Sequence, residues 1–133
     1  MDALQRNLPL IGRILLSLIF LASGLMKFGD WSGNIAYMNS KGFFLTQFFL
    51  AAATVIEIAG ALMVMLGWKA RLGAAALALF TLVAAFTMHN FWSVPDATIQ
   101  MYETAMFMKN LTIVGGLLLV VAFGPGPRSL DNR

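Results

Sequence analysis

Residues 43–67, FFLTQFFLAAATVIEIAGALMVMLG, decide the fold of this chain. The stretch is almost wholly apolar and exceeds the roughly 20 residues that an α-helix needs to cross the hydrocarbon core of a bilayer. One ionisable side chain, Glu57, lies near its middle. A charged side chain at that depth costs roughly 2.5–3.5 kcal/mol on insertion scales. Glu57 therefore requires a partner, a bound ligand or its neutral form.

The composition indicates lipid as the solvent for much of the surface. Of the 133 residues, 59% are hydrophobic and 11% are charged, against about 45–50% and 25% in soluble domains. The absence of cysteine excludes disulfides, thiolate metal sites and a thiol nucleophile. The net charge of +3 comes from single basic residues at segment ends, which argues against nucleic-acid binding. The length predicts one domain over 1–133.

Four apolar segments predict an all-α membrane protein. The predicted spans are about 8–28, 43–67, 70–92 and 102–124. Glycine and proline punctuate their ends, as in the run Gly124-Pro125-Gly126-Pro127. Because Arg13 lies within the first segment, which is also long for a signal peptide, we interpret that segment as a retained span. Short connections favour an antiparallel, up-down-up-down four-helix bundle.

The distribution of basic residues predicts the orientation. One face would carry Arg6, Lys69, Arg71, Arg128 and Arg133. The other face would carry Lys27 and Lys41, together with Asp30, Asp96 and Glu103. The positive-inside rule therefore places both termini in the cytoplasm. On the outer side we expect an interfacial helical turn in the connection 29–42 and a loop over 93–101.

Small residues predict where the helices approach each other, because packing in lipid depends on close backbone contact. Ala70, Ala74 and Ala78 form a ridge at four-residue spacing along the third span. The glycines expected to provide similar patches on the other spans are Gly24, Gly60, Gly115 and Gly116.

Arg13 is the predicted partner of Glu57. At 1.5 Å per residue, Glu57 lies roughly 15 Å and Arg13 roughly 8 Å from the inner boundary, a gap that a guanidinium on its stem can largely cover. Three interpretations stay open. The pair fixes the helix register, or Glu57 exchanges a proton with a bound ligand, or a neutral Glu57 donates a hydrogen bond to a backbone carbonyl. In the second case Glu57 and Arg13 are the candidate catalytic residues.

A second polar group is expected in the outer half of the bundle. Its members are Lys27, His89, Asn90, Lys109 and Asn110. A cation and an imidazole facing an apolar cavity suit the carbonyl oxygens of a quinone, so these residues are the candidate quinone-binding set. One histidine cannot supply bis-histidine haem ligation within a protomer. No metal site is predicted.

Several motifs resemble the DoxX family. Arg13 and the run Ser23-Gly24-Leu25-Met26-Lys27 resemble its opening, and Glu57-Ile58-Ala59-Gly60-Ala61 resembles its second-helix motif. The run Phe107-Met108-Lys109-Asn110 and the closing Ser129-Leu130-Asp131 resemble the YqjF/YphA-like inner-membrane branch. The resemblance implies a compact four-helix protein of the bacterial inner membrane. Some relatives are small membrane subunits of a thiosulfate:quinone oxidoreductase, and others are assigned to oxidative-stress complexes.

Three functional hypotheses follow. The first is a quinone-interacting or redox-associated membrane subunit, whose enzyme activity, if any, is that of an accessory subunit of a quinone-linked oxidoreductase. The alternative is a structural or assembly protein that docks a partner and uses its polar groups only to fix helix register. A transporter is the weakest, because no mid-span proline interrupts the spans. The expected partners are membrane lipid, a membrane redox protein or further copies of the chain. Thiol chemistry would need a partner to provide the thiols.

Overall fold

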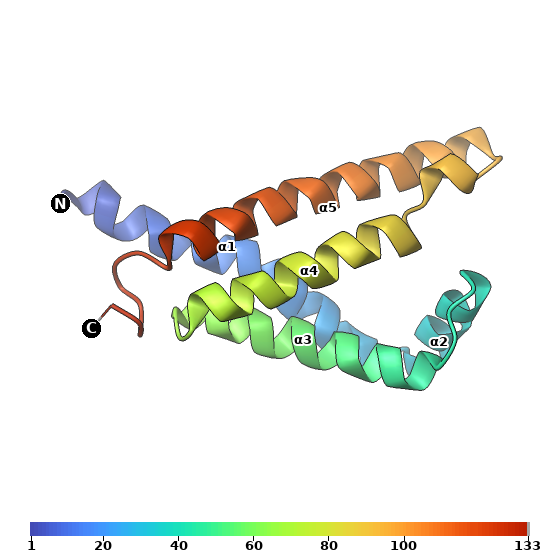
Figure 1. Ribbon diagram of the computed structural model, residues 1–133, viewed down its shortest axis with the longest axis horizontal. Coiled ribbons are helices and arrows are strands. Elements are labelled where there is room, and N and C mark those ends of the chain that lie inside the picture. Colours follow the sequence, from blue (N-terminus) through green and yellow to red (C-terminus); the bar gives the residue numbers. More distant parts are fainter. Residues whose placement is uncertain (133) are drawn as a thin grey trace.

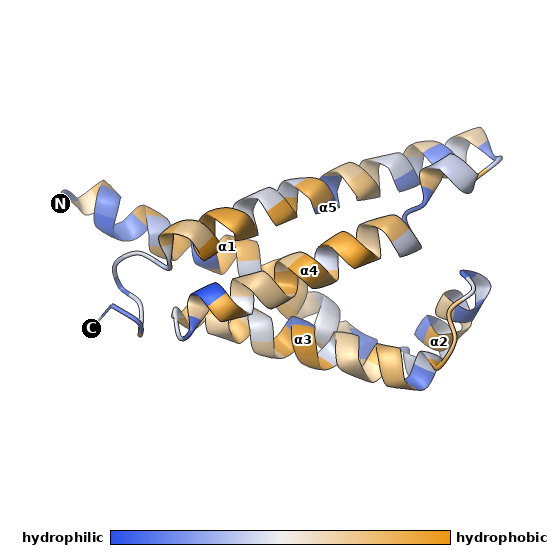
Figure 2. Cartoon of the chain, viewed as in Figure 1, coloured by the Kyte–Doolittle hydropathy of each residue, from blue (hydrophilic) through white to orange (hydrophobic). Residues whose placement is uncertain are grey.

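The computed structural model describes residues 1–132, and within them the chain is all-helical (Figure 1). The elements are α1 (Ala3–Lys27), α2 (Trp31–Ser40), α3 (Thr46–Leu66), α4 (Ala70–Met88), the 3₁₀-helix η1 (Phe91–Ser93) and α5 (Ala97–Phe123). Helices α1, α3 and α5 are each long and apolar enough to cross a membrane, and so is the segment that combines α4 with η1. The predicted fold class is therefore confirmed. Figure 2 shows that apolar residues dominate these four helices, while polar residues gather toward the loops and chain ends.

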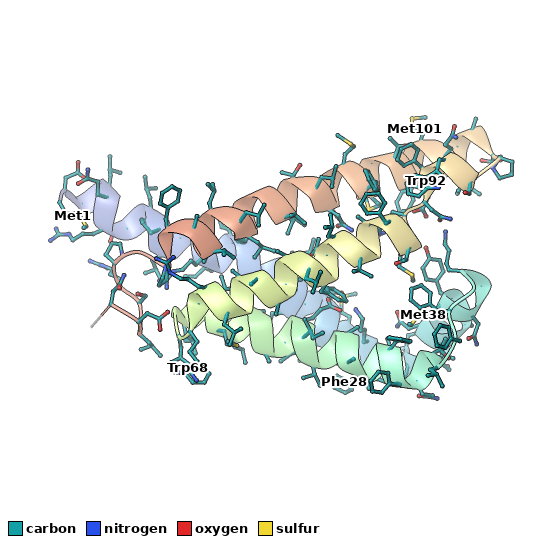
Figure 3. All side chains as sticks on the ribbon, viewed as in Figure 1. Met1, Phe28, Met38, Trp68, Trp92 and Met101 are labelled. Atoms are coloured by element: carbon teal, nitrogen blue, oxygen red, sulfur yellow. The ribbon has the colours of Figure 1, made fainter. Side chains whose placement is uncertain are left out.

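Both termini lie at the same end of the molecule, together with the α3–α4 turn (Figure 1). We call this the terminal end and the opposite one, with α2 and η1, the distal end. Trp68 lies at the terminal end and Trp92 at the distal end, as expected for aromatic residues at the two membrane interfaces (Figure 3). The cytoplasmic placement of the termini stays a prediction, and Arg133, one of the residues behind it, lies outside the described residues.

The helix boundaries differ from the predicted spans at several places. Helix α5 begins at Ala97 instead of about residue 102, because the Asp96 side chain accepts hydrogen bonds from the backbone N–H groups of Thr98 and Ile99. Residues 97–101 are thus helix, where a loop was expected. Helix α4 ends at Met88, before the predicted 92. The expected interfacial turn is the ten-residue helix α2.

The four long helices pack in the order α1, α3, α4, α5, and α1 meets α5 at few places. The predicted alanine ridge is buried inside the bundle, with Ala70 and Ala74 fully buried and Ala78 nearly so. Gly60 lets Leu77 approach the α3 backbone. Gly115, however, has open space where a side chain would stand, so its predicted packing role is wrong.

The bundle is closed in its terminal half and open in its distal half. Gly116 of α5 meets Leu16 of α1, and the buried core joins residues of all four long helices, including Phe20, Leu77 and Leu117. Toward the distal end the α4–α5 pair diverges from the α1–α3 pair (Figure 1). The space between the pairs holds the cavity described next.

Candidate functional site: a cavity in the distal half

A cavity of about 390 Å³ lies between the two helix pairs, with α2 contributing to its wall. Its volume falls within the range of small-molecule sites, about 300–1,000 Å³. Most of the lining is apolar and includes Phe20, Leu50, Ile56, Phe80 and Ile113. A few polar side chains share this lining, which is the usual composition of a small-molecule site.

An ion pair between Glu57 and Lys27 lines the cavity. Lys27 Nζ lies 2.5 Å from Glu57 Oε1 and also donates a hydrogen bond to Ser23 Oγ at 3.0 Å. The Glu57 side chain is 3% exposed and that of Lys27 is 16% exposed. The approach of Nζ to Oε1 is close but not aligned as a hydrogen bond, so Oε1 lacks a hydrogen-bond partner among the described residues.

The predicted pair between Arg13 and Glu57 is wrong. Arg13 instead donates to the carbonyl oxygen of Arg128 at 2.8 Å, at the terminal end. The reason is the stagger of α1 against α3. Gly24 packs at the level of Glu57, where a Cβ would lie 3.3 Å from Glu57 Cβ. Lys27, one turn further along α1, therefore reaches back to the carboxylate, and Arg13 lies about three turns away in the other direction.

Lys109 and Asn110 bring α5 into the same cavity. Asn110 is 8% exposed and its side chain forms no hydrogen bond within residues 1–132. Lys109 Nζ contacts only the Met106 sulfur, at 3.6 Å, within the described part of the chain. Both side chains thus have free hydrogen-bonding groups for a bound molecule.

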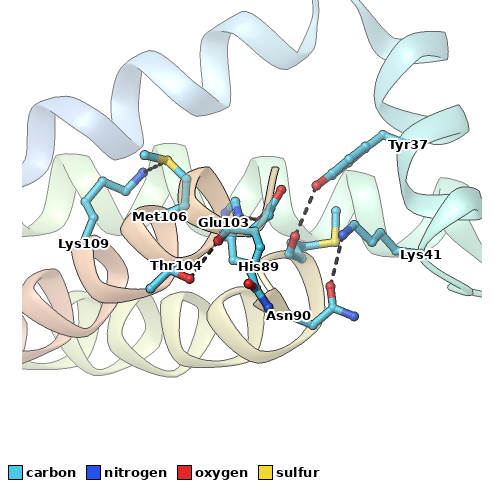
Figure 4. Close-up of polar contacts among 10 residues, drawn as sticks. Tyr37, Lys41, His89, Asn90, Glu103, Thr104, Met106 and Lys109 are labelled. Carbon is cyan, nitrogen blue, oxygen red and sulfur yellow. Dashed lines mark hydrogen bonds and ion pairs between the residues drawn. The ribbon is translucent and has the colours of Figure 1, made fainter. Parts of the chain in front are cut away.

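His89 lies at the distal mouth of the cavity, where it pairs with Glu103 (Figure 4). The distance from His89 Nδ1 to Glu103 Oε2 is 2.7 Å, and this contact joins the end of α4 to α5. Asn90 is not part of the cavity lining. Its Oδ1 accepts a hydrogen bond from Lys41 Nζ at 3.0 Å.

Helix α2 is attached to the end of α4 by two hydrogen bonds. One is the Lys41–Asn90 contact, and in the other the Tyr37 hydroxyl donates to the Met88 carbonyl oxygen at 3.2 Å (Figure 4). Burial, and then the negative charge of Glu103, raise the pKa of Tyr37 above its ordinary value of 10.0. Tyr37 is thereby kept as a neutral donor, and α2 closes part of the cavity mouth.

The structure brings together five of the seven predicted site residues. Lys27, Glu57, His89, Lys109 and Asn110 line the cavity, whereas Arg13 and Asn90 do not. Sequence reasoning missed Glu103, which is 6% exposed, and Tyr37. The N-cap signal at Asp96 would have placed Glu103 two turns inside α5.

A separate polar cluster fastens the terminal end. The Asp131 carboxylate accepts hydrogen bonds from the backbone N–H groups of Lys69 and Ala70, at 2.8 and 2.9 Å, and so caps α4. Arg71 Nη1 donates to the carbonyl oxygens of Val121 and Ala122 at the end of α5. We call residues 125–132 the C-terminal clasp, because they tie α1, the α3–α4 turn and α5 together.

The clasp should weaken in acid. The hydrogen bond from the Ala70 N–H is the largest cause that lowers the pKa of Asp131 from its ordinary 3.8. Desolvation raises this pKa, whereas the Lys69 N–H and the positive charge of Arg13 lower it further. Because the folded-state pKa is the lower one, the carboxylate stabilises the clasp above about pH 4, and this contribution is lost as pH falls through the folded-state pKa. Hydrogen-exchange protection of the Lys69 and Ala70 amides should fall over that window. Asp131→Ala should remove it at every pH; unchanged protection in this variant would contradict the assignment.

The cavity and the clasp occur on a chain with recognisable relatives. Residues 8–90, from early in α1 to just past α4, match the family model DoxX. The chain belongs to the DoxX family. It is 35% identical to inner membrane protein YqjF of Escherichia coli (strain K12) over 123 residues, 92% of this chain and 88% of that protein. It is 33% identical to inner membrane protein YphA of the same organism over 126 residues, 95% and 89% of the two chains.

This chain is also similar, over part of its length, to longer proteins. The Surfeit locus protein 4 homolog of Schizosaccharomyces pombe is 39% identical over 80 residues, 59% of this DoxX-family chain and 26% of that protein. No solved structure matches the chain. The matched region includes Lys27, Glu57 and His89, while Lys109 and Asn110 lie beyond it.

Proposed function

We propose that this DoxX-family chain is a multi-pass protein of the bacterial inner membrane that binds a quinone in the distal cavity, as a membrane subunit associated with a redox partner. The names of YqjF and YphA support the choice of membrane. The observation that carries the proposal is the cavity itself, whose apolar walls surround a buried ion pair and free donors in the distal half of the bundle.

The donor set suits a quinone head. A quinone has carbonyl oxygens on a flat apolar ring, and these oxygens need hydrogen-bond donors. Asn110 and Lys109 have N–H groups without strong acceptors within residues 1–132. Bound quinones supply electron transfer between membrane enzymes; here the side chains would hold the ring, and the apolar walls would take its tail.

Glu57 is the group placed to gain or lose a proton at the cavity. Its carboxylate is paired with Lys27, and one oxygen still lacks a hydrogen bond. A carboxylate beside a cavity whose ligand changes charge is a suitable proton acceptor when it is held in position. Lys27 and Ser23 provide that position.

Quinone binding is directly testable on the purified protein in mild detergent. We expect a short-chain ubiquinone analogue to bind at one per chain. Asn110→Leu should weaken binding about fivefold to tenfold, because it removes a hydrogen bond worth about 1 kcal/mol and fills the cavity wall. The matched control is Asn39→Leu, an exposed position on α2 outside the cavity lining. Equal binding by wild type and Asn110→Leu, or no saturable binding at all, would refute the proposal.

A second candidate function has its own support at the terminal end. Arg13, Arg71 and Asp131 form contacts that only fasten helices to one another. This favours a structural or assembly protein in which the polar groups fix helix register. That function predicts no specific phenotype for His89→Ala as long as the variant folds, so a specific phenotype for folded His89→Ala would count against it.

A further inference from the structure

Lys109 lies near the centre of α5 without a counter-charge. At 1.5 Å per residue, it stands roughly 20 Å from either end of the helix. Its ammonium group contacts the Met106 thioether at 3.6 Å, and a thioether is a weak acceptor that carries no charge. Within residues 1–132 no carboxylate lies within 4 Å of Lys109. An ionisable side chain at membrane depth without a partner indicates a functional site.

The charges around the cavity leave one positive charge uncompensated. Lys27 and Glu57 neutralise each other. At the mouth, Lys41 and Glu103 contribute one charge of each sign. Lys41 contacts Asn90, and Glu103 contacts His89. Lys109 remains, and Figure 4 shows it apart from the contacts at the mouth. The neighbouring Asn110 amide adds donors that can bind an anion as well as a carbonyl oxygen.

We propose that the cavity selects an amphiphile with an anionic head group and that Lys109 makes the charge contact. This inference rests on one part of the proposed function, namely that the cavity holds a membrane-soluble ligand. The new element is the charge of that ligand. The chemistry is a head with an ionised oxygen, such as an acidic hydroxyquinone or a carboxylate, attached to an apolar tail. The tail would lie against the apolar lining from α3 and α4.

A matched ligand pair tests the charge preference. The first ligand is a 2-hydroxy-1,4-naphthoquinone with a short alkyl chain, which is ionised at pH 7, and the second is its neutral methyl ether. Binding is measured in detergent by equilibrium dialysis, with protein-free micelles subtracted. Wild type should bind the anion about tenfold more tightly, the scale expected for a hydrogen bond to a charged group. Equal or weaker binding of the anion would overturn the proposal.

Two variants of Lys109 assign the preference to its charge. Lys109→Met should lower the ratio of the two affinities to about one, whereas Lys109→Arg should keep most of it. Arg6→Met is the control, since Arg6 is exposed near the start of α1, far from the cavity. A preference that survives in folded Lys109→Met refutes the role of Lys109. If Lys109→Met does not fold, Lys109→Gln makes the same test, because it also removes the charge; a preference that survives in folded Lys109→Gln refutes the role of Lys109.

Two further ligands separate this inference from the quinone proposal. A fatty acid of matched length tests whether the ring is needed. If it binds with the same dependence on Lys109 while neutral quinones do not bind, the anionic preference stands and the quinone proposal fails. Inorganic phosphate tests the source of the anion. Displacement by phosphate supports a site for the charged head alone, and lack of displacement supports a site that also needs the tail.

Discussion

Replacing Glu57 by methionine is expected to destabilise the bundle by about 3 kcal/mol. The substitution leaves the largely buried Lys27 ammonium without its carboxylate, and breaking a buried ion pair from one side costs about 3–5 kcal/mol. The Lys27 side chain is only 16% exposed, so water cannot easily replace the lost partner. The free energy of unfolding, measured by titrating SDS into mixed micelles, checks the expectation.

The same pair offers its own control through a double-mutant cycle. Lys27→Met alone should cost a similar amount, because it leaves the Glu57 carboxylate without its cation. The double variant should recover most of the stability, since apolar replacements of a whole buried pair are often neutral. Additive losses in the double variant would show that the two side chains are not energetically coupled.

Replacing Gly67 by alanine is expected to destabilise the terminal end by about 2–4 kcal/mol. Gly67 ends α3 with φ of 68°, a left-handed conformation that costs about 1 kcal/mol for a residue with a Cβ. The added methyl group would also overlap Arg13 Nη1 and the Ser129 side chain of the C-terminal clasp. Overpacking of this kind typically costs about 1–3 kcal/mol more. SDS unfolding would report the total.

Gly115→Ala is the matched control for this substitution. Gly115 lies inside α5, and a methyl group there meets nothing within 4 Å. The change should be neutral or stabilise the protein by up to about 1 kcal/mol, because alanine is the better helix former. A loss at Gly115 as large as the loss at Gly67 would mean that the clasp geometry is not the cause.

The architecture could be predicted because each part of it depends on local composition. The four apolar runs specify the spanning segments, the helical turn expected in the connection 29–42 is α2, and the alanine ridge marked a buried face of α4. These features follow from side chains that are neighbours in sequence. No knowledge of how one helix is displaced along another is needed.

The candidate site was only partly predictable because it depends on such displacement. Depths counted from assumed boundaries put Arg13 beside Glu57, whereas the close contact at Gly24 sets α1 so that Lys27 takes that place. An error of a few residues at the start of α5 likewise hid Glu103 by assigning it to the water interface. Whether Lys27 or Lys109 has a charged partner therefore depends on how the helices are displaced along one another.

The sparse contact between α1 and α5 has a mechanical consequence. The two helix pairs are joined along α3 and α4, and across the other side mainly where Leu16 meets Gly116. A small rotation of one pair about that line widens or narrows the distal gap while every helix keeps its own backbone hydrogen bonds. Rotation of one helix pair against the other, with the terminal end held by the clasp, would let the cavity fit ligands of different width.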